Sequence, residues 1–110
     1  MRRGDIVTVA GGSPYTSKPR PAVIVQSDLF DATLSVTLCP CTTERLPASA
    51  VRVELQPNSG NGLRRTTWVM ADKVTTLPRA RLGPRIGSLD PSDATRLDRA
   101  LHVFLGLAGA

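Results

Sequence analysis

The chain has 110 residues, the length of one domain, and we expect a single domain over residues 1–110. Fourteen Lys and Arg residues against nine Asp and Glu residues give a net charge of +5, and all but two of the basic residues are arginines. The arginine fork matches phosphate oxygens, so this excess favours a nucleic-acid partner, although a GC-rich genome would also raise the arginine count. Two cysteines and one histidine are too few for a structural zinc site, and no apolar run approaches the roughly 18 residues of a membrane span. We therefore expect a cytoplasmic protein without a metal or another cofactor.

Short apolar segments separated by turns predict a mainly β chain. The expected strands cover residues 4–9, 21–25, 34–39, 50–55 and 66–74. Between them, residues 11–19 form a turn-rich loop that is a candidate lid over a substrate. Residues 27–31 predict one turn of helix, with Ser27 or Asp28 as its cap, and residues 57–62 predict a tight turn. Beyond the last strand, the prolines and glycine at 78, 83 and 84 predict loops or short strands.

Alternation within residues 66–74 predicts which side chains share a face of that strand. Thr67 falls on one face, and Trp68, Met70 and Asp72 fall on the other. The same rule applied to residues 50–55 puts the charged side chains on the face opposite the apolar ones.

One helix is expected near the C-terminal end. Asp90 is a suitable N-cap, Pro91 suits the first helical position, and Gly106 is a stop signal. An apolar stripe with helical spacing consists of Ala94, Leu97, Leu101, Phe104 and Leu105. Val103 lies opposite this stripe and suggests a partner surface. Short strands, long loops and one helix together predict a small, mainly antiparallel barrel with the helix packed on it.

Two segments carry the chemistry that the sequence suggests. Arg20 and Pro21 lead into an apolar strand, and a second apolar strand ends in the hydroxyls of Thr42 and Thr43. Pairing of these strands could bring a guanidinium and a hydroxyl to one place, a combination suited to holding a phosphodiester. The alternatives are a surface arginine made rigid by flanking prolines and a strand-end hydroxyl that satisfies a turn.

Five ordered pieces of the chain resemble the MazF/PemK (Kid) family of toxin endoribonucleases. They are Arg3-Gly4-Asp5-Ile6, the Arg-Pro strand 20–25, the strand 36–43 that ends in Pro-x-Thr-Thr, the segment 62–74 with its late Asp, and the small elements at 80–82 and 86–89. The resemblance implies an SH3-like antiparallel barrel of the CcdB/PemK type with a C-terminal helix, usually a homodimer. It also implies metal-independent, sequence-selective cleavage of single-stranded RNA, and neutralisation by a cognate antitoxin.

The resemblance assigns roles to particular residues. Arg20 falls at the family's arginine position and would stabilise the phosphate, Thr42 would hydrogen-bond it, and Asp72 would take part in acid–base chemistry. The alternative for Asp72 is an ion-paired carboxylate. The expected RNA-binding residues are Lys18, Thr43, Arg64, Arg65, Thr67 and Arg81. Residues 13–19 lack the family's glutamate and second glycine, so the recognised sequence and the acid–base pair stay open.

Several further readings stay open at this stage. The arginines at 64, 65, 79, 81 and 85 form either a phosphate-tracking groove or a solvated face. Tyr15 and Trp68 are candidates for base stacking, with Trp68 also suited to a core or a dimer interface. One alternative function is a non-enzymatic CcdB-type toxin that binds DNA gyrase, but the chain ends in Leu107-Ala108-Gly109-Ala110 instead of the Trp-Gly-Ile associated with that activity. Another is a nucleic-acid-binding barrel without chemistry.

Overall fold

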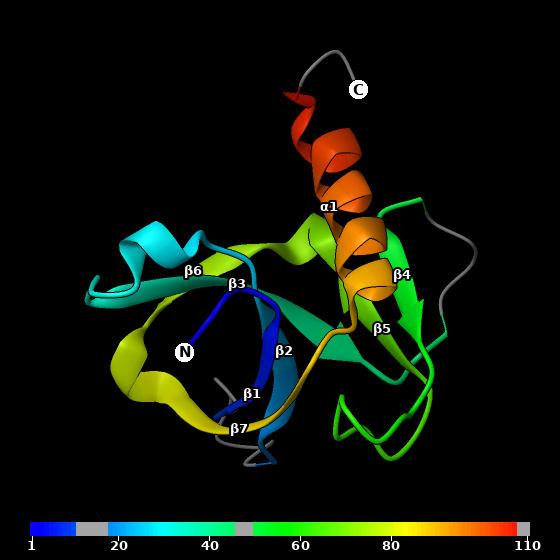
Figure 1. Ribbon diagram of the computed structural model, residues 1–110, viewed down its shortest axis with the longest axis horizontal. Helices are drawn as coiled ribbons and strands as arrows, with labels where there is room; N and C mark the ends of the chain where they lie inside the picture. The colour runs from blue at the N-terminus through cyan, green and yellow to red at the C-terminus, as the bar shows by residue number, and fades with distance from the viewer. Residues whose placement is uncertain (11–17, 46–49, 108–110) are drawn as a thin grey trace.

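The computed structural model describes residues 1–10, 18–45 and 50–107 (Figure 1). Over these residues the chain forms seven strands, three short 3-10 helices and one α-helix. In chain order they are β1 (Asp5–Val9), β2 (Arg20–Ile24), η1 (Asp28–Phe30), β3 (Ser35–Thr42), β4 (Arg52–Leu55), β5 (Thr67–Met70), η2 (Ala71–Lys73), β6 (Thr75–Pro78), η3 (Arg79–Arg81), β7 (Leu82–Ser88) and α1 (Pro91–Leu105). No helix in the described ranges is long and apolar enough to cross a membrane.

The strands form one antiparallel sheet in the order β4-β5-β3-β2-β1-β7, with β6 paired to β3 outside that path. One edge of β3 pairs with β2, while its other edge pairs first with β6 and then with β5. The mainly β fold with a C-terminal helix is confirmed. The sheet curls but is not a closed barrel, because β4 and β7 form no ladder with each other in the described ranges. The loop after β4 bridges this gap, where the Ser88 amide donates to the Gly60 carbonyl.

Alternation along the strands divides the apolar side chains into two buried clusters. The first includes Ile6, Val23 and Val69 and is covered by Leu97 and Leu101 of α1. The second lies on the other face of β1, β2 and β3 and consists of Val7, Ala22, Ile24, Val36 and Leu38. A sheet with apolar residues on both faces explains how so short a chain builds a core. Where the second cluster ends, side chains that point away from the first cluster lie on the outer face of the sheet.

The C-terminal helix begins and ends where the sequence predicts. The Asp90 carboxylate accepts a hydrogen bond of 2.8 Å from the Asp93 amide, and Gly106 ends the helix at a φ of 67°, which favours glycine. The expected apolar stripe is only half correct, because Phe104 and Leu105 are 45% and 50% exposed. Figure 1 shows the reason, since the last turns of α1 extend beyond the sheet.

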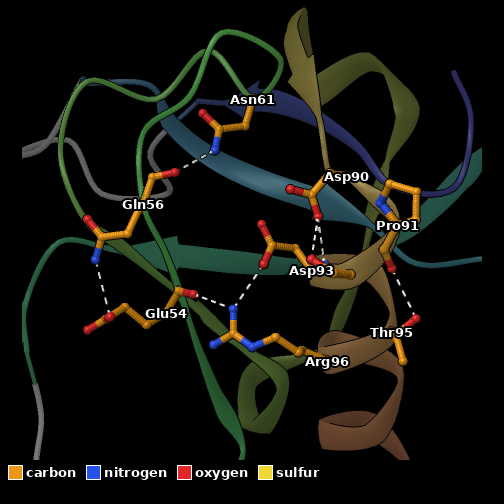
Figure 2. A network of polar contacts seen from close by, with 9 residues as sticks. Glu54, Gln56, Asn61, Asp90, Pro91, Asp93, Thr95 and Arg96 are labelled. Carbon is orange, nitrogen blue, oxygen red and sulfur yellow. Dashed lines mark hydrogen bonds and ion pairs between the residues drawn. The ribbon is translucent and has the colours of Figure 1, made fainter.

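Polar contacts fix the first half of α1 against β4. Arg96 Nη1 donates to the Glu54 carbonyl at 2.8 Å and pairs with the Asp93 carboxylate at 3.0 Å. Figure 2 shows this guanidinium between the helix and the strand, with Gln56 and Asn61 following along the chain after β4. The helix therefore helps to position β4.

Two stretches differ from the sequence prediction. The expected strand 66–74 stops at Met70, since the chain turns through η2 and then pairs with β3 as β6. Asp72 therefore lies in a 3-10 turn and not on a strand face. Conversely, Gly83 and Pro84 do not break the chain but lie within β7. Proline is tolerated there because β7 is an edge strand and its pairing with β1 shifts register between Val7 and Val9.

Candidate functional site

The pairing of β2 with β3 aligns Arg20 with Thr42. Ala22 stands opposite Pro40 in the last pair of this ladder, and Arg20 and Thr42 each lie two residues further on. A step of two residues keeps a side chain on the same face, so both project from the face that carries Ala22 and Pro40. The structure thus places the two main candidate residues at the same end and on the same face of neighbouring strands.

A cleft of about 180 Å³ opens beside Arg20. Its lining includes the guanidinium-bearing residues Arg20 and Arg81 and the apolar residues Ala22, Leu38 and Leu77. Arg81 donates to the Ala10 carbonyl at 3.1 Å. Arg20 is exposed, and in the described part of the chain its side chain makes neither a hydrogen bond nor an ion pair. An exposed guanidinium without a protein partner is free to bind an anion.

The Thr42 hydroxyl makes a hydrogen bond within a turn, which was the alternative to a phosphate-binding role. Its Oγ1 accepts a hydrogen bond of 3.1 Å from the Glu44 amide, which closes a turn at the end of β3. A hydroxyl that accepts one hydrogen bond keeps its own hydrogen for donation. Thr42 can therefore satisfy the turn and still donate to a phosphate oxygen, and Thr43 is exposed next to it.

A row of side chains continues from Thr42 across the neighbouring strands. Thr42 stands opposite Trp68 of β5, and Trp68 stands opposite Glu54 of β4. The residues next to these, Val69 and Val53, belong to the first buried cluster, so the row lies on the outer face. The sequence alone gives the face of Trp68 but not its partner, because the β3–β5 register depends on the tertiary fold.

Asp72 is the ion-paired carboxylate of the alternative reading. Its two oxygens accept hydrogen bonds of 3.2 and 3.1 Å from Arg52. These contacts hold the pKa of the Asp72 carboxyl below its ordinary value, which makes the carboxylate a weaker base. Asp72 also follows Trp68 by four residues, roughly 10 Å of strand and 3-10 helix. Arg52 was not among the predicted site residues, although the alternation of residues 50–55 placed it on the charged face of its strand.

The five clustered arginines differ in whether their side chains contact the protein. Arg79 donates to the carbonyls of Thr33 and Asp31, and Arg85 pairs with the Asp5 carboxylate at 3.1 Å. Three of the five arginines, Arg81 included, therefore hold parts of the fold together. Arg64 and Arg65 are exposed and, within the described ranges, have no side-chain partner.

Other predicted residues divide by exposure. Lys18 is exposed, near Arg20 in the chain. Thr67 is only 2% exposed, and its hydroxyl donates to the Arg65 carbonyl at 3.0 Å. Its side chain offers no surface to RNA, so we leave it out of the proposed site. Tyr15 and residues 11–17 of the candidate lid lie outside the described residues. Over the described ranges, no group of three or more His, Cys, Asp and Glu side chains could hold a metal ion.

Comparisons with known proteins agree over nearly the whole chain. A family model for PemK-like, MazF-like toxins of type II toxin–antitoxin systems matches residues 2–105. A probable endoribonuclease MazF of Mycolicibacterium smegmatis is 51% identical over 109 residues, which cover 99% of this chain and 100% of that protein. Endoribonuclease MazF9 of Mycobacterium tuberculosis is 30% identical, over 97% of this chain and 98% of that protein. A solved mycobacterial endoribonuclease in complex with its cognate antitoxin is 26% identical with a TM-score of 0.81, over 97% of this chain and 96% of that chain.

Proposed function

The chain belongs to the PemK-like, MazF-like toxin family, and we propose that it is an endoribonuclease toxin that cleaves single-stranded RNA at selected sequences and inhibits translation. Messenger RNA is the main expected substrate, with ribosomal or transfer RNA as further candidates, and the cytoplasm is where it would act. The observation that carries the proposal is the alignment of Thr42 with Arg20, which lines a cleft, in a chain that is 51% identical over its length to a probable endoribonuclease.

The proposed reaction needs no metal. The 2′-hydroxyl of one ribose loses its proton and attacks the adjacent phosphorus, and the bond to the next 5′-oxygen breaks while that oxygen gains a proton. Arg20 binds the non-bridging oxygens, whose negative charge grows in the pentacoordinate state. Thr42 donates its free hydroxyl hydrogen to the same phosphate. Lys18, Thr43, Arg64, Arg65 and Arg81 contribute hydroxyl and positive groups that hold the flanking RNA.

We propose two alternative roles for Asp72. Acid–base chemistry by Asp72 is the first, and positioning of Arg52 through their ion pair is the second. The pH profile of the cleavage rate distinguishes them. If Asp72 accepts the proton, Asp72→Asn removes the acidic limb of the profile, whereas loss of positioning lowers the rate by the same factor at every pH.

Two protein partners belong to the proposal. The solved relative in complex with its cognate antitoxin supports a cognate antitoxin for this chain as well. A homodimer is supported by the exposed apolar side chains at the end of α1, namely Val103, Phe104, Leu105 and Leu107. No feature of residues 1–10, 18–45 and 50–107 favours the gyrase-binding alternative, and the relatives described above are named as a probable endoribonuclease and an endoribonuclease.

Cleavage of a long single-stranded RNA in excess chelator, followed by mapping of the new ends, tests the proposal. Wild-type protein should give discrete fragments. Arg20→Ala should cut on the order of 10²–10³-fold more slowly. Arg99→Ala removes another exposed arginine, in the middle of α1, and should cut at the wild-type rate. Intact RNA with inhibited gyrase would favour the CcdB-type activity, and retarded but uncut RNA would favour a binding protein without chemistry.

Thr42 gives a second test through the separation of rate from binding. Thr42→Ala should lower the cleavage rate far more than RNA affinity, because the donated hydrogen bond strengthens as charge develops on the phosphate. Equal losses in both would show that Thr42 only positions the RNA.

A further inference from the structure

Trp68 lies beside the proposed phosphate-binding residues without an evident role in folding. It stands directly opposite Thr42 in the β3–β5 ladder, so the two side chains leave the same face with their Cβ atoms about 5 Å apart. The next pair of the ladder, Cys41 and Val69, points into the first buried cluster instead. The only tryptophan of the chain therefore borders the hydroxyl that would hold the scissile phosphate.

The cross-strand neighbours of Trp68 are polar, and its side chain is partly exposed. Its side chain is half-buried and does not belong to the apolar residues that pack against either buried cluster. Its neighbours across the sheet are Thr42 on one side and Glu54 on the other. In the part of the chain that the structure describes, the indole N–H donates to no protein group. A tryptophan usually stabilises a fold by burying a large apolar area, but Trp68 is only partly buried.

We propose that Trp68 stacks on the base next to the scissile phosphate and so helps to select the nucleotide at the cleavage point. This inference rests on the proposed endoribonuclease function. Adjacent strands lie about 4.8 Å apart, so an indole one strand from Thr42 is within reach of a base whose phosphate Thr42 holds. An aromatic ring stacks on any base. Any selection would therefore come from Thr42 and Glu54, which flank Trp68 across the sheet.

The test uses Trp68 as its own reporter. Wild-type cleavage first maps the cut, and an RNA of that sequence with a 2′-deoxy group at the attacking ribose then binds without being cut. Because the chain has one tryptophan, a fluorescence change on titration reports on Trp68 alone. We expect the change to saturate at the same Kd that anisotropy of a labelled RNA gives. Unchanged fluorescence at saturating RNA would overturn the inference.

A double-mutant cycle then identifies the stacked base. Trp68→Ala should weaken binding of the uncut RNA roughly 5- to 100-fold, as expected for one lost stacking contact, and Trp68→Phe should restore most of it. Removing the adjacent base should weaken binding to the wild type but should cost Trp68→Ala little more. Phe30→Ala, which removes another exposed aromatic ring, should bind as the wild type does.

The remaining outcomes separate the two proposals. Wild-type protein that cuts RNA, together with an abasic penalty that is equal in wild type and Trp68→Ala, would refute stacking and leave the endoribonuclease function intact. Wild-type protein that neither binds nor cuts RNA would refute both. A change of oligomeric state in folded Trp68→Phe, together with wild-type fluorescence that follows protein concentration instead of RNA, would assign Trp68 to a subunit interface.

Discussion

Replacing Asn61 by alanine removes three hydrogen bonds from the loop between β4 and β5. The Asn61 side chain is 1% exposed, and its Oδ1 accepts from the amides of Asn58 at 3.1 Å and Leu63 at 3.0 Å. Its Nδ2 donates to the Gln56 carbonyl at 2.9 Å, a contact drawn in Figure 2. At about 1 kcal/mol for each bond, and more for groups left unpaired away from water, Asn61→Ala should destabilise the fold by about 3–5 kcal/mol.

Urea unfolding of the wild type and of Asn61→Ala, followed by circular dichroism, measures this loss. The same change should lower Tm by roughly 15 °C for a domain of this size. Ser59→Ala in the same loop is the control, because Ser59 is exposed, and it should stay within about 0.5 kcal/mol of the wild type. A loss below about 1 kcal/mol for Asn61→Ala would refute the reasoning, since it would mean that water replaces all three contacts.

Three further predictions concern the scaffold and the ion pair. Gly87→Ala should destabilise the fold by about 2 kcal/mol or more in urea, because the new Cβ would lie 2.6 Å from the Gly60 carbonyl oxygen, whereas Gly60→Ala, with 3.5 Å of clearance, should change little. Burial raises the pKa of both the Cys39 and Cys41 thiols to about 12. Iodoacetamide at pH 8 should therefore leave both thiols unlabelled in the folded protein and label both in guanidinium, as measured by mass spectrometry. Rapid labelling of the folded protein would contradict this prediction. The lowered pKa of Asp72 contributes stability that is present above its unfolded value near 4 and is lost as pH falls through the folded value. The stability difference between wild type and Asp72→Asn should therefore be larger at pH 7 than at pH 3, and an equal difference at both would count against the ion pair.

Local signals were enough to predict the elements that depend on their own residues. Asp90, Pro91 and Gly106 set the bounds of α1, and Ser27 caps the 3-10 turn at Asp28–Phe30 as expected. The error at residues 66–74 has a different origin. Because β-branched and apolar residues continue past Met70, the local pattern does not predict the turn at η2. The turn follows from the pairing of β6 with β3, which is a tertiary contact.

The candidate site shows the same division. Arg20 and Thr42 were found from strand-end chemistry and from a family resemblance, and the observed register aligns them. The position of Trp68 beside Thr42 and the capture of Asp72 by Arg52 depend on pairings between distant strands. Thr67 illustrates the limit of motif transfer. The family resemblance suggested an RNA contact for Thr67, but alternation turns its side chain inward, where it donates to a backbone carbonyl.

The site lies where β3 exchanges one partner strand for another. Residues Ser35–Leu38 pair with β6 and residues Cys41–Thr42 pair with β5, so the end of β3 is held by β5 alone on that edge. The start of β5 is in turn fixed from the opposite side, by the Asn61 contacts and by the Thr67 hydroxyl. The position of Trp68 beside Thr42 therefore rests in part on Asn61 and Thr67, two buried polar residues. If Arg64 and Arg65 bind RNA as proposed, we expect substitutions at these exposed positions to change which RNA is bound without moving Thr42 or Trp68.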